Sequence, residues 1–190
     1  MEFILASASP RRKELLKEVV ANFEIFPAKG EEKATQKRPK NLVTELAKQK
    51  AEEVFSLPFA KGKIVLGADT VVAFQGKALG KPKDEAEAIS MLESLSGRAH
   101  FVYTGVCFLY EKKGKKKVLC EAAKTKVYFN ELSREWIENY VSSGSPMDKA
   151  GAYGIQDGGL VKKIKGSYSC VVGLPVELVK KMVKKAQKQG

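Results

Sequence analysis

The sequence predicts a mixed α/β fold, α/β or α+β in class, formed by residues 1–190 as a single domain. Short apolar runs typical of strands alternate with segments that have the apolar spacing of helices, and no repeat is visible. A chain of 190 residues forms one substantial domain, with or without a small lobe, but not two large ones. Its 44% hydrophobic and 29% charged residues exclude a disordered chain.

The first third of the chain predicts two strands and two helices. Residues 2–6 form a short apolar run that favours a buried strand, and residues 23–27 predict a second strand. Ser9-Pro10 is typical of the N-cap and first position of a helix. After a polar loop, apolar residues at helical spacing predict a second helix over residues 39–57.

The middle of the chain predicts a buried strand, a helix and a long hairpin. Residues 63–74 are the most apolar stretch and predict a β region that is interrupted at Gly67-Ala68-Asp69. Asp84 is placed to cap a third helix, which Gly97 ends. Two strand-like runs within residues 101–129 flank a lysine-rich turn and predict a hairpin.

The last third predicts a helix from Ser133, a glycine-rich loop over residues 151–159, and short strands at residues 160–164 and 168–172. Pro175 begins a terminal helix whose valines face inward and whose lysines face solvent. The inward-facing valines are Val176, Val179 and Val183.

The chain is strongly basic, with 34 Lys and Arg against 22 Asp and Glu and a formal net charge of +12. The excess gathers in two runs, at residues 112–117 and 180–188. Such charge suits nucleotides, nucleic acid or anionic lipid. We interpret the two runs as solvated surface rather than as a nucleic-acid-binding site, because no aromatic residues alternate with their lysines.

The sequence predicts a cytoplasmic protein that does not enter a membrane. No apolar run approaches the ~20 residues that a membrane-spanning helix needs. The first apolar stretch is very short and precedes its charges, which is the reverse of a signal peptide. Cys107, Cys120 and Cys170 lack the C-x-x-C spacing of metal sites, so we expect reduced thiols.

The segment from Ser7 to Arg12 is a candidate anion-binding site. It joins a strand to a helix N-terminus, where unpaired N–H groups favour anions. Arg11 and Arg12 oppose the helix dipole, a local cost that a bound polyphosphate would offset. The alternative is an ordinary Ser-Pro cap with surface arginines, and these residues alone do not decide between the two.

Two charged residues fall in apolar surroundings. Lys50 lies on the apolar stripe of its helix, so its ammonium either extends to solvent or reaches an anion in a pocket. Asp69 lies in the most apolar stretch, where a carboxylate is poorly solvated unless it binds a metal, a cation or a water. The alternative for Asp69 is a turn in which its side chain bonds its own backbone.

Two loops add candidate ligand contacts. The GKP segment at residues 80–82 lacks the spacing and the Ser/Thr of a P-loop, which excludes a P-loop ATPase, but Lys81 can still reach a phosphate. The loop over residues 148–156 ends in Gln156, whose amide can pair with a base edge unless the loop is only mobile surface. His100, the single histidine, excludes a multi-histidine metal site, and we interpret it as structural.

Taken together, these segments resemble the Maf family of nucleotide pyrophosphatases. The match rests on motifs that include SASPRR, GADT, GKP and GSYSCVVGLP and that follow one another along nearly the whole chain. Each motif is weak alone, but eight in the same order are specific. The matching segments lie at residues 7–12, 31–32, 47–51, 67–70, 80–82, 96–105, 148–156 and 166–175.

The resemblance implies an elongated mixed sheet flanked by helices, with two lobes around a cleft, similar to the inosine triphosphate pyrophosphatase fold. It implies hydrolysis of a nucleoside triphosphate to the monophosphate and pyrophosphate with a divalent metal, Mg²⁺ or Mn²⁺. Family members are cytoplasmic and often homodimers. The ending Gly154-Ile155-Gln156 resembles the branch that acts on dTTP and UTP, and the choice among thymine, uracil and modified pyrimidines stays open.

The resemblance also implies roles for individual residues. Asp69 is expected to accept a proton, and one of Glu31 and Glu32 is expected to act with it. The expected catalytic residues are Asp69, Glu32 and Lys81, with Glu32 and Asp69 as metal ligands. The expected substrate contacts are Ser7, Arg11, Arg12, Lys50, Thr70 and Gln156, of which Arg11, Thr70 and Gln156 set substrate choice.

The chemistry of triphosphate hydrolysis agrees with this residue set. Water attacking phosphorus needs cations on the phosphate oxygens and an acceptor for its proton, and the basic and acidic residues named above supply both. Two other functions stay open, namely a nucleic-acid-binding module that uses the lysine runs and a catalytically silent nucleotide sensor in division control. Turnover of nucleoside triphosphates distinguishes them from an enzyme.

Overall fold

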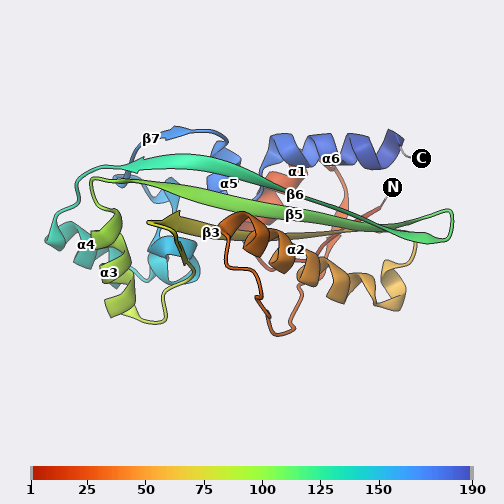
Figure 1. The fold of residues 1–190 in the computed structure, drawn as a ribbon, viewed down its shortest axis with the longest axis horizontal. Coiled ribbons are helices and arrows are strands. Elements are labelled where there is room, and N and C mark those ends of the chain that lie inside the picture. The colour runs from red at the N-terminus through yellow and green to blue at the C-terminus, as the bar shows by residue number, and fades with distance from the viewer. Residues whose placement is uncertain (1, 189–190) are drawn as a thin grey trace.

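The computed structural model describes residues 2–188, which form a mixed seven-stranded sheet with helices on both faces (Figure 1). The strand order is β2-β1-β3-β5-β6-β7, and β4 pairs with the free end of β3. Strand β1 is parallel to β2 and β3, and all other pairs are antiparallel. The strands are β1 (Phe3–Leu5), β2 (Phe23–Ile25), β3 (Ile64–Phe74), β4 (Lys77–Leu79), β5 (Ala99–Lys112), β6 (Lys115–Phe129) and β7 (Val161–Lys165).

In the described part of the chain, six α-helices accompany the sheet, and most of their predicted starting points are confirmed. Ser9, Asp84 and Ser133 each accept a hydrogen bond from a backbone N–H in the first turn of the helix that follows. No helix within residues 2–188 is long and apolar enough to cross a membrane. The helices are α1 (Pro10–Lys17), α2 (Pro39–Phe55), α3 (Glu85–Leu95), α4 (Arg134–Ser142), α5 (Tyr168–Val172) and α6 (Val176–Lys188).

The helices divide the core into three clusters. On one face of the sheet, α1 and α6 cover one end and α3 and α4 cover the other. On the opposite face, α2 is the one α-helix of the described chain that packs on the sheet, along the half of β5 that leads to the hairpin turn (Figure 1). Val176 and Val179 of α6 are buried as predicted, whereas Val183 is half-buried and Met182 completes the stripe.

Strand β3 is continuous, so the predicted interruption at Gly67-Ala68-Asp69 is wrong. The glycine serves packing instead. A Cβ on Gly67 would collide with the backbone of Ala47 in α2, and one on Gly105 of β5 would collide with Val43. The helix backbone therefore lies directly against two neighbouring strands, an approach that only glycine permits.

Residues 168–172 form helix α5 rather than the predicted strand. Their aromatic and β-branched residues suit a strand, but Ser167 accepts a hydrogen bond from the Cys170 N–H at 3.2 Å and starts a helical turn. Gly173, with φ of 129°, ends it. The caps at both ends therefore decide the conformation, because the segment is too short for its β propensity to determine it.

The expectation of three reduced thiols is also wrong, because Cys107 and Cys120 form a disulfide. They lie directly opposite each other on β5 and β6, with Cα atoms 4.1 Å apart. Both strands of this hairpin extend further than the sequence predicted, and their register brings together two cysteines whose sequence spacing gave no sign of pairing. Cys170 is free and buried.

Candidate active site

A gap in the edge of β3 opens the main cavity of the described structure. Strand β1 pairs with Ile64–Leu66 and β4 pairs with Val72–Phe74, so neither covers Asp69 and Thr70 between them. A cavity of about 720 Å³ opens there. All nine residues that the sequence predicted for the site line it, namely Ser7, Arg11, Arg12, Glu32, Lys50, Asp69, Thr70, Lys81 and Gln156.

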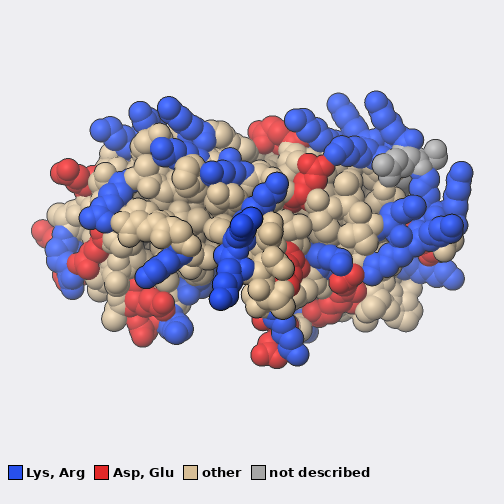
Figure 2. Space-filling view, viewed as in Figure 1, with Lys and Arg blue, Asp and Glu red and all other residues tan. Residues whose placement is uncertain are grey.

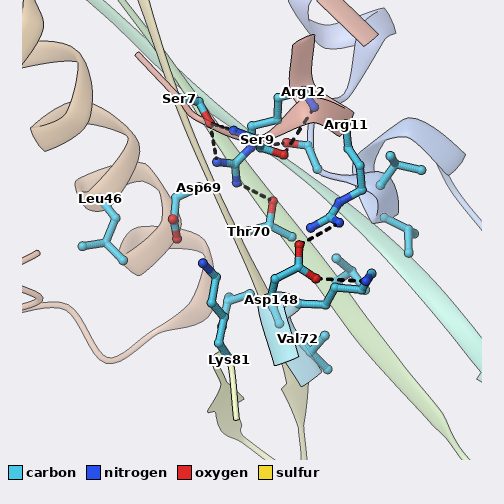
Figure 3. Close-up of a pocket in the computed structure, with 18 of the residues that line it drawn as sticks. Ser7, Ser9, Arg11, Arg12, Leu46, Asp69, Thr70, Val72, Lys81 and Asp148 are labelled. Atoms are coloured by element: carbon cyan, nitrogen blue, oxygen red, sulfur yellow. Dashed lines mark hydrogen bonds and ion pairs between the residues drawn. The ribbon is translucent and has the colours of Figure 1, made fainter. Parts of the chain in front are cut away.

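Arg12 is fixed at one wall of the cavity by three different elements (Figure 3). Its guanidinium donates to the Ser7 hydroxyl at 3.2 Å, to the Thr70 hydroxyl at 3.2 Å and to the Gly173 carbonyl at 2.9 Å. Burial lowers the pKa of Arg12, and the nearby carboxylate of Asp69 opposes that shift. The guanidinium is thus a preoriented cation in a poorly solvated position, which suits phosphate oxygens.

Lys50 lies between two carboxylates on the opposite wall. Its ammonium is 2.5 Å from Asp69 Oδ1 and 3.0 Å from Glu32 Oε1. The Lys50 side chain is 17% exposed and that of Asp69 13%, so both charges are mostly shielded from water. The close packing of α2 on Gly67 brings Lys50 over Asp69, which makes the predicted pocket lysine and apolar-strand carboxylate partners.

Glu32, rather than Glu31, faces the cavity. Glu32 pairs with Lys50 and lines the main cavity. Glu31 lines only a shallow neighbouring hollow formed with Glu52 and Glu53. Glu32 therefore has the position that the predicted role requires, and which of the two glutamates acts stays a prediction.

Arg11 and Lys81 bring further positive charge to the rim. Lys81, in the loop after β4, points its amino end toward Asp69 in Figure 3. Arg11 pairs with Asp148 at 3.1 Å. Burial alone would raise the pKa of Asp148, but Lys149 and Arg11 hold it below its usual range. The sequence gave no sign of this pair, because its members are 137 residues apart.

Gln156 lies on an exposed loop whose base is tied to the protein. Asp157 accepts hydrogen bonds from Tyr140 at 2.5 Å and Ser145 at 2.9 Å. The Tyr140 hydroxyl in turn accepts from the Gly154 N–H at 3.1 Å. Gln156 itself lines the cavity with an exposed side chain. The loop therefore presents a free amide to whatever occupies the cavity.

His100 contacts the same loop from its buried side. Its Nε2 atom lies 2.7 Å from the Tyr153 hydroxyl, and Tyr153 lines the cavity. The ring is 1% exposed, and burial lowers the pKa of His100 to about 4. The structural interpretation of His100 agrees with this position, because a buried neutral imidazole packs against the loop without facing the cavity.

Two carboxylates of the cavity could hold a divalent metal. Within residues 2–188, no group of three or more His, Cys, Asp and Glu side chains is suitably placed for one. Asp69 and Glu32 nevertheless converge on a single cation, the Lys50 ammonium. Mg²⁺ typically binds one or two carboxylates and takes its other ligands from water and substrate phosphates. The residues present therefore fit such a metal in the company of a phosphate ligand.

The geometry of the cavity defines a class of site. Fixed cations line two walls, a shielded carboxylate lies between them, and a free amide stands at the rim. Such a cavity suits a small polyanion attached to a polar ring, and its chemistry is that of a protein that binds or cleaves phosphate compounds.

This chain belongs to the Maf family. The sequence profile of the family described as Maf-like protein matches residues 2–186. The dTTP/UTP pyrophosphatase of Agathobacter rectalis is 50% identical over 189 residues, with 92% of each chain covered. The dTTP/UTP pyrophosphatase of Carboxydothermus hydrogenoformans is 49% identical, covering 93% of this chain and 94% of the relative.

The fold is also similar to that of a protein of very different sequence. A solved structure of the Staphylococcus aureus Ham1 protein superposes with a TM-score of 0.55 at 13% identity, covering 98% of this chain and all of that one. At this identity the likeness shows the fold alone. It agrees with the mixed sheet flanked by helices that the sequence predicted.

Proposed function

We propose that this chain is a nucleoside triphosphate pyrophosphatase that hydrolyses dTTP and UTP to the monophosphate and pyrophosphate. The observation that carries the proposal is the Lys50 ammonium held between Asp69 and Glu32, opposite the fixed guanidinium of Arg12. The names of the relatives, each 49–50% identical over more than nine tenths of the chain, support the same activity.

In this proposal the cations bind the triphosphate and Asp69 activates water. Arg12, Lys50 and Lys81 bind phosphate oxygens, with Lys50 leaving its carboxylates for the substrate. Asp69 accepts the proton of a water molecule whose oxygen attacks the α-phosphorus. The bond from that phosphorus to the oxygen of the β-phosphate breaks, and pyrophosphate leaves. Fixed charges around the transferring group are the main source of rate in such reactions.

We also propose that Asp69 and Glu32 hold Mg²⁺ or Mn²⁺ together with the substrate. A bound divalent cation would neutralise charge on the triphosphate and strengthen its polarisation. Arg11, Thr70 and Gln156 would select the nucleotide. The amide of Gln156 both donates and accepts, which matches the paired acceptor and donor on the edge of uracil or thymine.

Turnover of a panel of nucleoside triphosphates, with products separated by chromatography, tests the proposal. UTP or dTTP with Mg²⁺ is expected to yield monophosphate and pyrophosphate in one step, faster than purine triphosphates. Nucleoside diphosphate and orthophosphate as primary products would mean attack at the γ-phosphorus and would contradict the assignment. Glu32→Gln, with Glu31→Gln as the matched control, then tests which glutamate acts, and only Glu32→Gln is expected to impair turnover.

A further inference from the structure

The part of the sheet that α2 leaves uncovered carries aromatic rings alternating with lysines. In Figure 1, α2 runs beside the half of β3 and β5 that leads to the hairpin turn, and no helix is drawn across the other half of β5 and β6. Phe101 and Tyr103 of β5 and Tyr128 of β6 are all half-buried there. We call this surface the aromatic–lysine face; its members are Phe101, Tyr103, Tyr128, Lys124, Lys126 and Lys163, with Lys165 at its edge.

The strand register places all these side chains on one side of the sheet. Phe101 lies opposite Lys126, and Tyr103 lies opposite Lys124. Across the next pair of strands, Tyr128 lies opposite Lys163. Residues directly opposite each other in neighbouring strands point to the same face, so rings and ammonium groups form a two-dimensional pattern that the linear sequence hides.

The lysines contact the rings rather than carboxylates. The Lys124 ammonium is 3.8 Å from the centroid of Phe101, and Lys126 and Lys163 lie 5.0 Å and 4.9 Å from the centroid of Tyr128. Among the ion pairs of residues 2–188, none involves Lys124, Lys126, Lys163 or Lys165. Their charge is therefore not neutralised within the described chain.

The pKa of Tyr128 indicates the same excess of positive charge. The pKa of its hydroxyl lies below the usual range because Lys126 hydrogen-bonds to it, and because Lys126, Lys165 and Lys163 add positive charge. In Figure 2, Lys and Arg side chains stand over the uncovered part of the sheet. An anion approaching this face meets concentrated positive charge above rings.

We propose that the aromatic–lysine face binds single-stranded nucleic acid. Bases stack on aromatic rings whatever their sequence, and lysines between the rings contact the phosphates. The Phe101 and Tyr103 centroids are 6.5 Å apart, which allows successive bases of an extended strand to use them. The lysine runs at residues 112–117 and 180–188 lack rings between their lysines, whereas this face has them.

The chemistry of the face disfavours two other occupants. A second copy of this chain placed on it would set lysines against lysines, and such like-charge contacts oppose association. Duplex nucleic acid keeps its bases stacked inside, so it could use the lysines but not the rings. We therefore expect this surface to bind single strands in preference to duplex.

Fluorescence anisotropy with a labelled oligonucleotide of about ten nucleotides tests the proposal, because such a length covers one typical single-strand site. The protein is expected to bind the single strand more tightly than the duplex of the same sequence. Contact with three or four phosphates predicts a slope of about −2 to −3 for the logarithm of affinity against that of salt concentration. Binding is expected to persist when the cavity holds a dTTP analogue with a methylene bridge between the α- and β-phosphorus.

Two charge-matched variants separate the face from general basicity. Lys124→Glu with Lys163→Glu is expected to lower affinity about tenfold or more, whereas Lys115→Glu with Lys117→Glu at the hairpin end of β6 lowers it far less. Phe101→Leu keeps an apolar side chain and is expected to lose about fivefold through stacking. All three variants should keep turnover of UTP or dTTP within about twofold, which shows that they fold.

Several outcomes would overturn the proposal. These are equal loss from the two charge-matched variants, equal affinity for single strand and duplex, displacement of the strand by the dTTP analogue, and binding to anionic lipid vesicles but not to the oligonucleotide. None of them bears on the pyrophosphatase activity, which the turnover of small triphosphates reports separately.

Discussion

The cations of the cavity and the lysines of the hairpin and α6 differ in how firmly they are held. Arg12 makes three hydrogen bonds to other elements, and the Lys50 side chain lies 17% exposed between two carboxylates. The lysines of residues 113–117 are all exposed, and Figure 2 shows many Lys and Arg side chains gathered at that end of the molecule. Net charge alone therefore does not locate a site, whereas fixed charge beside a cavity does.

The difference has a physical origin. An exposed lysine is screened by salt and loses side-chain entropy when it orients, so it contributes little to a defined geometry. Lys116 pairs with Glu52 at 3.0 Å, but both side chains remain more than one third exposed. A buried guanidinium cannot relax away from its partners, and its orientation is set before a ligand arrives.

The largest effect is expected from Asp69, the carboxylate of the cavity. Asp69→Asn keeps the shape and removes the charge, and loss of a general base costs about 10²–10⁴-fold in rate. Loss of a metal ligand as well would enlarge the effect. The measurement is kcat for UTP or dTTP at saturating Mg²⁺, with circular dichroism to confirm folding. A folded variant with near-parental kcat would remove Asp69 from the mechanism.

Acid is expected to destabilise the folded protein through His100, which contacts Tyr153 of the cavity wall. Burial lowers the pKa of His100 to about 4 from 6.5, so protons bind the unfolded chain more readily. The stability contributed by the neutral ring is complete above pH 6.5 and falls by about 3 kcal/mol as the pH drops toward 4. Urea unfolding over this range measures the loss.

His100→Gln is the matched variant for the acid effect. It removes the titrating group, so its free energy of unfolding should depend less on pH between 4 and 6.5 than that of the parent. Identical pH slopes in the two proteins would show that the acid sensitivity has another source. The comparison uses slopes because the substitution also removes the contact with Tyr153.

A smaller effect is expected at the rim of the cavity. Gln156→Glu removes the amide donor and adds a charge, so pyrimidine turnover should fall by about 10–100-fold, the scale of one lost hydrogen bond in a specific site. The readout is kcat/KM across the triphosphate panel. Unchanged selectivity would mean that the base binds elsewhere than beside Gln156.

The smallest effect is expected from the exposed lysine run. Replacing the five lysines of residues 112–117 by neutral polar residues, with Gly114 retained, should leave turnover of small triphosphates within a few-fold at physiological salt, because distant exposed charge is screened. A collapse of turnover would erase the distinction between fixed and exposed cations.

Local signals predicted most of the fold. Caps at Ser9, Asp84 and Ser133 and the apolar periodicity located the helices, since both act within a few residues. Two errors arose where distant segments decide. Gly67 suggested an interruption because nothing near it reveals that α2 packs on it, and the Cys107–Cys120 disulfide depends on the hairpin register. The strand predicted at residues 168–172 was a local error, because the caps at Ser167 and Gly173 favour a helical turn.

The candidate site was predictable to a similar extent. The ordered motifs identified a set of residues that all line one cavity. Lys50 and Asp69 were also notable individually, because each places a charge in apolar surroundings. Their pairing, and that of Arg11 with Asp148, could not be predicted, because both depend on how α2 and the loop after α4 pack. The aromatic–lysine face was hidden for the same reason, since three strands contribute to it.

Hydrolysis in water enriched in the heavy isotope of oxygen tests the central claim most directly. Attack at the α-phosphorus and attack at the β-phosphorus both yield monophosphate and pyrophosphate, so product identity alone does not distinguish them. With Asp69 activating water at the α-phosphorus, mass spectrometry should find the heavy oxygen in the monophosphate and none in pyrophosphate. Heavy oxygen in the pyrophosphate would contradict the account.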